Sequence, residues 1–173
     1  MQPTIVTWSP DAFVPGAVTN RTMKRHAAAW ADECVRRSMS REEMFKIDHL
    51  GIAVKSLTAA SAIYEKLGLT ISSEETVEAE KVRLVMVPVG ESRLELLEAT
   101  SEDSTIAKFI ARRGEGLHHI CLRVPDLAAS VERLKQDGVR LVSDEIKVGA
   151  GGHRYVFVHP SSTGGVLLEL AEG

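Results

Sequence analysis

The chain has few cysteines, few aromatic side chains and no excess of positive charge. Two cysteines in 173 residues give no disulfide framework, which is typical of a reducing compartment or of a protein that does not rely on disulfides. The 21 Lys and Arg residues are outnumbered by 24 Asp and Glu residues, so no basic surface for nucleic acid is predicted. The apolar runs are far shorter than the roughly 18 residues of a membrane span, so no membrane partner is predicted either. Hydrophobic residues make up 44% of the chain, which is enough to bury a substantial core.

The first 44 residues differ in pattern from the rest of the chain. Residues 1–20 contain three prolines and no clear period, which is typical of coil. Residues 21–41 carry apolar side chains at helical spacing among Arg and Lys, which indicates a possible helix. A mitochondrial transit peptide would be poor in acidic residues, and Asp11, Asp32 and Glu33 argue against one. We therefore expect an amino-terminal extension over 1–44 and one domain over 45–173.

The most informative feature of the chain is a block that occurs twice. Residues 48–57, Asp-His-Leu-Gly-Ile-Ala-Val-Lys-Ser-Leu, correspond to residues 118–127, His-His-Ile-Cys-Leu-Arg-Val-Pro-Asp-Leu, at a separation of 70 positions. The copies also end alike, in Leu94-Glu95-Leu96 and Leu168-Glu169-Leu170, where the separation has grown to 74. The second copy therefore contains four extra residues (74 − 70), which we expect in the loop around 159–164.

Each copy has the pattern of a strand, a helix and three further strands. In copy one, alternating apolar residues indicate a strand over 46–54, and helical spacing indicates a helix over 57–67. The other strands of copy one are expected over 69–75, 80–89 and 92–98. Copy two is expected to have a strand over 117–124, a helix over 127–137 and strands over 139–145, 153–159 and 165–171. The sequence thus predicts an α+β fold of two tandem βαβββ units, over 46–98 and 117–171, whose curved mixed sheets surround a metal-containing cleft.

Two His and two Glu occupy equivalent positions of the two copies. Successive side chains of a strand point to opposite faces, so His49 shares a face with Gly51 and Ala53, whose small size leaves room for a ligand. A single His or Glu on a strand is more often a structural or solvated residue, but four at symmetric positions favour a divalent-metal site. The expected ligands, with ligating atoms within about 5 Å of one another, are His49, Glu95, His119 and Glu169.

His118 is left out of this ligand set. Its counterpart in copy one is Asp48, and strand alternation points its side chain away from that of His119. We interpret His118 as a residue that supports the ligands from behind or lies at the surface.

Several longer segments carry a family resemblance. They are Asp48–Val54, Leu94–Glu98, Glu102–Phe109, Gly114–Ile120, and His159-Pro160 followed by Thr163–Leu170. Over roughly residues 46–172 the chain resembles the vicinal oxygen chelate superfamily, and within it the methylmalonyl-CoA epimerase family. The stretches Glu-Asp-Ser-Thr-Ile-Ala-Lys-Phe and Gly-Glu-Gly-Leu-His-His favour this family over glyoxalase I and dioxygenase relatives.

The resemblance implies a metal-dependent isomerase. Its reaction would remove the proton next to the thioester of methylmalonyl-CoA and return it to the other face, interconverting the (R) and (S) forms. The two His and two Glu would hold a divalent cation such as cobalt, manganese, zinc or nickel, which stabilises the charge of the enolate. Glu169 would also transfer a proton. The resemblance further implies an acyl-CoA substrate, a homodimer, and a location in the cytoplasm, or in the mitochondrial matrix of a eukaryote.

Two departures from the family pattern affect the implied chemistry. Some relatives have a second catalytic Glu on the strand that here reads Lys81-Val82-Arg83-Leu84-Val85, which has no carboxylate. Glu95, where some relatives have Gln, is our candidate for this second acid/base group, unless the chain belongs to a branch with a modified pair. Ser161 stands where relatives often have Lys, which removes one possible contact to the phosphates of coenzyme A.

Two other functions are compatible with the same pattern. One is a glyoxalase I-type lyase that acts on a glutathione hemithioacetal with the same four ligands. The other is a metal-free protein that binds a small molecule in the cleft, although such a protein has no need of two His and two Glu. Only a test with substrate separates the two enzymes.

Overall fold

The computed structural model describes residues 45–172, and the expectations for residues 1–44 lie outside this described part of the chain. The elements named η are short 3-10 helices. In chain order the elements are β1 (Lys46–Val54), α2 (Leu57–Lys66), β2 (Glu75–Val77), η2 (Glu78–Glu80), β3 (Val82–Val89), β4 (Ser92–Ala99), α3 (Thr105–Arg113), β5 (Gly116–Val124), α4 (Leu127–Gln136), β6 (Lys147–Val148), η3 (Ala150–Gly152), β7 (Arg154–Val158), η4 (Pro160–Ser162) and β8 (Leu168–Glu172).

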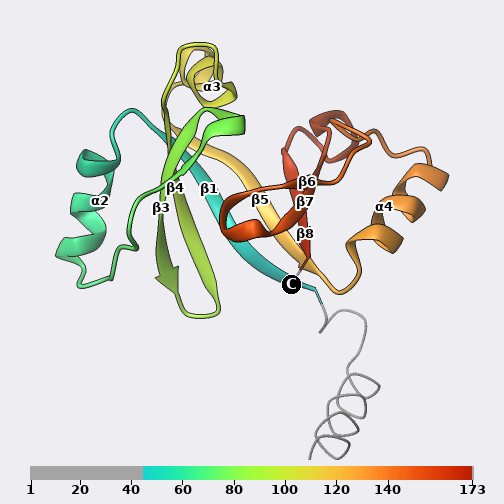
Figure 1. Cartoon of the computed structure of the whole chain (residues 1–173), viewed down its shortest axis with the longest axis horizontal. Coiled ribbons are helices and arrows are strands. Elements are labelled where there is room, and N and C mark those ends of the chain that lie inside the picture. Colours follow the sequence, from blue (N-terminus) through green and yellow to red (C-terminus); the bar gives the residue numbers. More distant parts are fainter. Residues whose placement is uncertain (1–44, 173) are drawn as a thin grey trace, which may run out of the picture. The chain divides into compact units, whose positions relative to one another are not determined.

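All of these strands belong to one eight-stranded mixed sheet with the order β2-β3-β4-β1-β5-β8-β7-β6. The first strands of the two copies, β1 and β5, pair antiparallel at its centre, and each takes the last strand of its own copy, β4 or β8, as a parallel neighbour (Figure 1). The α+β class and the two tandem units are confirmed. The two curved sheets that the sequence suggested are joined into one through β1 and β5.

The strands at the two edges of the sheet are shorter than the sequence predicts. Strands were expected over 69–75 and 139–145, but β2 has three residues and β6 has two, and both begin later. The apolar residues of the expected segments are nevertheless packed against the cores beneath α2 and α4. An alternating apolar pattern indicates that side chains are buried, not that the backbone pairs as a strand. Here the partly buried side chains belong to loops. They are Leu69 and Ile71 in copy one, and Val139 and Leu141 in copy two.

The helix α3 connects the two copies and was not predicted. The hydroxyl of Ser104 accepts a hydrogen bond from the backbone N–H of Ala107 at 3.0 Å and so caps its first turn. The helix ends at Gly114, whose φ of 78° is readily adopted only by glycine. Ile106 is buried against Ala53 of β1, which shares its face with His49, so α3 packs on the His face of the sheet. None of the helices within residues 45–172 is both long and apolar enough to span a membrane.

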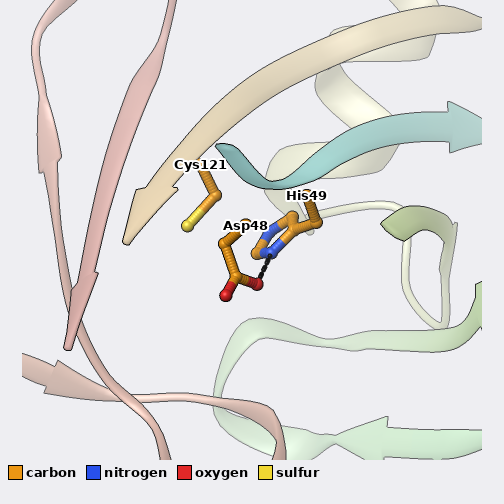
Figure 2. Close-up of side chains that lie close together, drawn as sticks. All are labelled: Asp48, His49 and Cys121. Atoms are coloured by element: carbon orange, nitrogen blue, oxygen red, sulfur yellow. Dashed lines mark hydrogen bonds and ion pairs between the residues drawn. The ribbon is translucent and has the colours of Figure 1, made fainter. Parts of the chain in front are cut away.

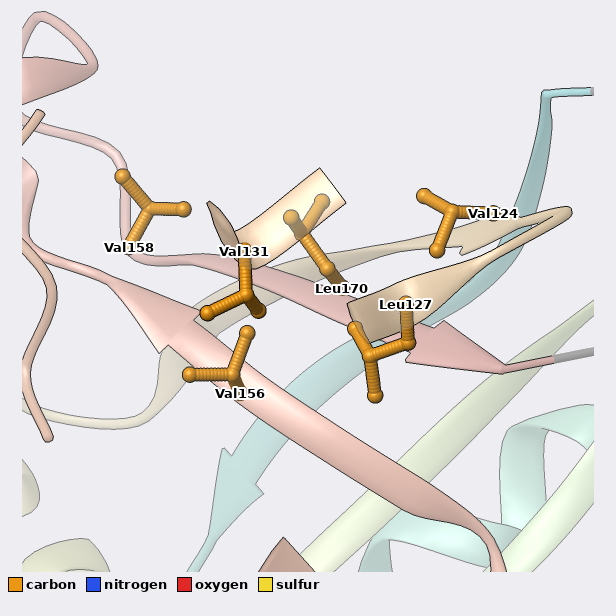
Figure 3. Close-up of a cluster of buried hydrophobic side chains, with 6 residues drawn as sticks. All are labelled: Val124, Leu127, Val131, Val156, Val158 and Leu170. Carbon is orange, nitrogen blue, oxygen red and sulfur yellow. The ribbon is translucent and has the colours of Figure 1, made fainter. Parts of the chain in front are cut away.

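The opposite face of the sheet is buried beneath α2 and α4, one helix for each copy. The two helices begin at equivalent caps, because the side chains of Ser56 and Asp126 each accept a hydrogen bond from the backbone N–H of the residue three positions later. Beneath α4 the core cluster joins the helix to β5, β7 and β8 (Figure 3). These buried residues are Val124, Leu127, Val131, Val156, Val158 and Leu170.

The substitution Leu127→Ala should destabilise the protein by about 2–5 kcal/mol, because Leu127 is fully buried and its removal leaves a cavity. Leu67→Ala, at the end of α2, is the matched control, since Leu67 is 68% exposed and should change stability by less than about 0.5 kcal/mol. Urea unfolding of the three proteins measures both effects. Equal destabilisation by the two substitutions would contradict the assignment of this core.

Candidate metal centre

The pairing of β1 with β5 contains two bulges at equivalent positions. Asp48 is an extra residue on β1 between the pairs Ile47↔Leu122 and His49↔Cys121, and His118 is the extra residue on β5. A bulge interrupts the alternation of a strand, and both Asp48 and His118 line the same cavity as the His that follows each of them. The prediction that His118 points away from His119 is therefore wrong, and the Nδ1 atoms of the two rings lie 3.0 Å apart.

The four side chains expected as ligands surround one point. Nε2 of His49 and Nε2 of His119 lie 3.1 Å apart. Oε2 of Glu169 is 3.1 Å from the His119 nitrogen and 3.8 Å from the His49 nitrogen. Oε2 of Glu95 is 3.5 Å from both nitrogens. All four residues are buried, so their polar atoms face one another rather than bulk solvent.

Strand register explains how residues far apart in the sequence reach this point. Gly51 lies opposite His119 on β5 and beside Glu95 on β4, while Cys121 lies beside Glu169 on β8. The ring of His119 occupies the space above Gly51, where a Cβ atom would lie only 2.1 Å from Cε1 of the ring. The absence of a side chain at Gly51 is therefore what admits His119 to the centre.

The buried carboxylates of the centre need positive charge close to them, either as protons or as a bound cation. Burial opposes the protonation of His49, but the nearby carboxylates of Glu169, Glu95 and Asp48 outweigh it and raise the pKa of His49 to about 9. Burial raises the pKa of Glu95. Burial acts on Glu169 in the same direction, but the imidazoles of His119 and His49, with nitrogens 3.1 and 3.8 Å from its Oε2, lower the pKa of Glu169 to about 2. A bound cation would replace the protons that balance these carboxylates.

The donor set fits a divalent cation. Two imidazole nitrogens and two carboxylate oxygens suit cations of the zinc, cobalt and manganese type. The donor atoms of His49, His119 and Glu169 lie within 4.8 Å of one another, and Oε2 of Glu95 lies 3.5 Å from both nitrogens. The space above Gly51 that a Cβ would fill is used by one of the donor rings. Their role as metal ligands stays a prediction of the sequence, and the geometry is compatible with it.

A second cluster of possible metal donors, Asp48, His49 and Cys121, lies next to this centre (Figure 2). Asp48 is already engaged by the guanidinium groups of Arg93 and Arg123, which would repel a cation. Burial and the nearby carboxylate of Glu169 raise the pKa of the Cys121 thiol far above its usual range, so it stays protonated. We therefore assign this cluster to hydrogen bonding rather than to metal binding.

The centre lies at the wall of a cavity of about 320 Å³ that both copies line. Sequence reasoning missed Glu80 in this cavity, whose carboxylate accepts hydrogen bonds from the Tyr155 hydroxyl at 3.0 Å and from Lys147 Nζ at 2.7 Å. Glu75 likewise accepts a hydrogen bond from the backbone N–H of Gly151 at 2.9 Å. These contacts join opposite edges of the curved sheet. No local pattern signals them, because the partners are more than 60 positions apart in sequence.

The family model of the glyoxalase/bleomycin resistance protein/dioxygenase superfamily matches residues 48–157. Human mitochondrial methylmalonyl-CoA epimerase is 38% identical over 129 residues, which cover 73% of this chain and 73% of the human protein. The chain belongs to the methylmalonyl-CoA epimerase family of this superfamily.

Solved structures of epimerases agree with this assignment. The Mycobacterium tuberculosis epimerase is 36% identical, with a TM-score of 0.73 and coverage of 79% of this chain and 94% of that one. An epimerase in complex with methylmalonyl-CoA and ammonium is 37% identical, with a TM-score of 0.71 and coverage of 75% and 95%. The resemblance drawn from the sequence motifs is confirmed.

In this member of the epimerase family, Gly51→Ala should weaken divalent-metal binding at least about tenfold, because the new Cβ displaces the ring of His119. Cys121→Ala, at the equivalent position of copy two, should retain the metal. Metal content after dialysis and calorimetric titration measure the difference, with circular dichroism to verify folding. Loss of the metal in Cys121→Ala, but not in Gly51→Ala, would instead place it at the Asp48, His49 and Cys121 cluster.

Proposed function

We propose that this protein interconverts the (R) and (S) forms of methylmalonyl-CoA by a metal-dependent proton transfer. Relatives named for this activity support the proposal, and one related structure contains methylmalonyl-CoA. The observation in this chain that carries it is the convergence of two imidazoles and two carboxylates at the wall of one cavity. Such a centre suits the stabilisation of an enolate, which forms when the proton next to a thioester is removed.

In the proposed mechanism the protein positions the substrate and moves the proton. His49, Glu95, His119 and Glu169 would hold the divalent cation, whether cobalt, manganese, zinc or nickel. When bound, it supplies Lewis-acid stabilisation of the negative charge that develops on the substrate oxygens. Glu169, on β8, would accept the proton from C2 of the substrate through its carboxylate. Its burial keeps bulk water away from the enolate.

Inversion needs a second group that delivers a proton to the opposite face of the enolate. Glu95 is the candidate from the sequence, but its Oε2 faces the same two imidazole nitrogens as that of Glu169. The structure adds Glu80, which lines the cavity and is held by Tyr155 and Lys147 of the other copy. Glu80 is not among the four expected ligands, so proton transfer by its carboxylate would not compete with metal binding. Glu80 and Glu95 are thus rival proposals for the second group.

The two alternative functions fit less well. A glyoxalase I-type lyase would use a similar set of four ligands, but several of the relatives that span most of this chain are named epimerases. A protein that only binds a small molecule would have no use for two buried carboxylates at one point, since their burial is unfavourable without a compensating cation.

We further propose that the protein forms a homodimer through the outer face of β1 and β5. Ile47 and Leu117 lie in these central strands and remain 49% and 54% exposed. Exposed apolar residues on a sheet that is otherwise covered by helices favour contact with a second copy. An acyl-CoA substrate would then enter from the opposite face, where the cavity lies. A cytoplasmic or mitochondrial location stays a prediction.

The metal-loaded protein should exchange the C2 proton of methylmalonyl-CoA for deuterium in heavy water, as measured by NMR. Removal of the metal with a chelator should abolish the exchange, and addition of the metal should restore it. Methylglyoxal with glutathione, tested in parallel, should give no lactoylglutathione. Formation of lactoylglutathione without exchange at C2 would support the lyase instead.

Glu169→Gln should reduce exchange at C2 by roughly 10²–10⁴-fold at saturating metal, because the amide can still coordinate but cannot accept a proton. Glu95→Gln and Glu80→Gln distinguish the second group, since only the variant that lacks it should show a loss of similar size. Metal content is measured for each variant. Full activity of Glu169→Gln, or of both other variants, would mean that different residues transfer the protons.

A further inference from the structure

Asp48 is a buried carboxylate that the proposed mechanism does not use. It is 6% exposed and lies in the bulge of β1 directly before the expected ligand His49. Its Oδ2 accepts a hydrogen bond from Arg123 Nε at 2.8 Å and a second from Arg123 Nη2, while Arg93 Nη2 donates to Oδ1. Arg93 comes from β4 and Arg123 from β5, so Asp48 ties three neighbouring strands together at one end of the centre.

The fourth contact of Asp48 is with Nδ1 of His49, at 3.0 Å from Oδ1 (Figure 2). A carboxylate held by two guanidinium groups is ionised, and an ionised carboxylate can only accept hydrogen bonds. Nδ1 of His49 is therefore the donor. This contact leaves Nε2 directed at His119 and the two Glu, which is the nitrogen that a metal would need.

The equivalent position in copy two lacks these properties. His118 occupies the matching bulge, and its Nδ1 lies 3.0 Å from Nδ1 of His119. Of two imidazole nitrogens that face each other, either one can donate, so this contact does not impose a tautomer on His119. The two expected His ligands thus occupy equivalent positions, but only His49 has a carboxylate hydrogen-bonded to its Nδ1.

We propose that Asp48, clamped by Arg93 and Arg123, is a positioning residue that sets the tautomer and orientation of His49 for metal binding, and that His118 has no comparable effect on His119. This inference rests on the proposed metal-dependent function. A carboxylate behind a metal-bound imidazole raises its basicity and fixes its ring, and removal of such a partner typically weakens metal binding 10–100-fold. The arginines hold the carboxylate ionised and in place.

Asp48→Asn tests the proposal, because an amide has the same shape but can donate to Nδ1 and so permits the wrong tautomer. Titration of the metal-free protein with cobalt(II) should show binding about 10–100-fold weaker than in the unsubstituted protein. The cobalt(II) absorption spectrum should change as well, because the ligand field around His49 is altered. His118→Asn, the matched control in copy two, should leave affinity and spectrum nearly unchanged.

Arg123→Gln keeps the carboxylate but removes its two-point clamp, and we expect an intermediate loss of cobalt(II) affinity. This variant decides the question if Asp48→Asn does not fold, which thermal unfolding of the metal-free proteins reveals. Unchanged affinity in a folded Asp48→Asn, an equal loss in His118→Asn, or no loss in Arg123→Gln would each overturn the proposal. A protein that binds cobalt(II) but does not exchange deuterium at C2 would instead disprove the proposed reaction and leave the role of Asp48 intact.

Discussion

The antiparallel pairing of β1 with β5 is the interaction on which the rest of the structure depends. It joins two copies that would otherwise form separate sheets, and it places the Nε2 atoms of His49 and His119 3.1 Å apart. A shift of one residue in this register would turn one of the rings to the outer face of the sheet. The bulges at Asp48 and His118 oppose such a shift, because each requires an unpaired residue at one defined point of its strand.

Charge is the second constraint on the centre. Glu95 and Glu169 are both buried, and a buried carboxylate without a cationic partner is unfavourable by several kcal/mol. The guanidinium groups of Arg93 and Arg123 are hydrogen-bonded to Asp48. Within residues 45–172, the ion pairs of Glu95 and Glu169 are with imidazoles. An imidazole can release its proton when a metal arrives, whereas a guanidinium cannot. The permanent positive charges of the arginines thus lie beside the centre, and the positive charge within it is carried by imidazole protons that a metal can replace.

What the sequence predicted correctly is what the repeat encodes. The strands that carry the two His and two Glu, the helices α2 and α4, and the fold class all follow from patterns that occur twice. What it missed departs from the repeat or from simple alternation. The helix α3 occurs once, and the bulge at His118 reverses the direction that alternation assigns to that side chain. Arg93 and Arg123 reach Asp48 from 45 and 75 positions away, and no local pattern encodes such contacts.

The same distinction between repeated elements and elements that occur once applies to the walls of the cavity. The symmetric strands supply the two His and two Glu, and a similar set would serve an epimerase or a lyase. Much of the remaining wall comes from strands that both copies contain, for example β3 through Met86 and β7 through Phe157, whereas α3, which occurs once, adds Thr105 and Ile106. The sequence stretches that favoured the epimerase family over its relatives, Glu102–Phe109 and Gly114–His119, fall on α3 and on the bulge beside it. We therefore expect the residues that select the carbon acid in α3 and at His118, where copy two differs from copy one, while the centre itself supplies chemistry common to several reactions.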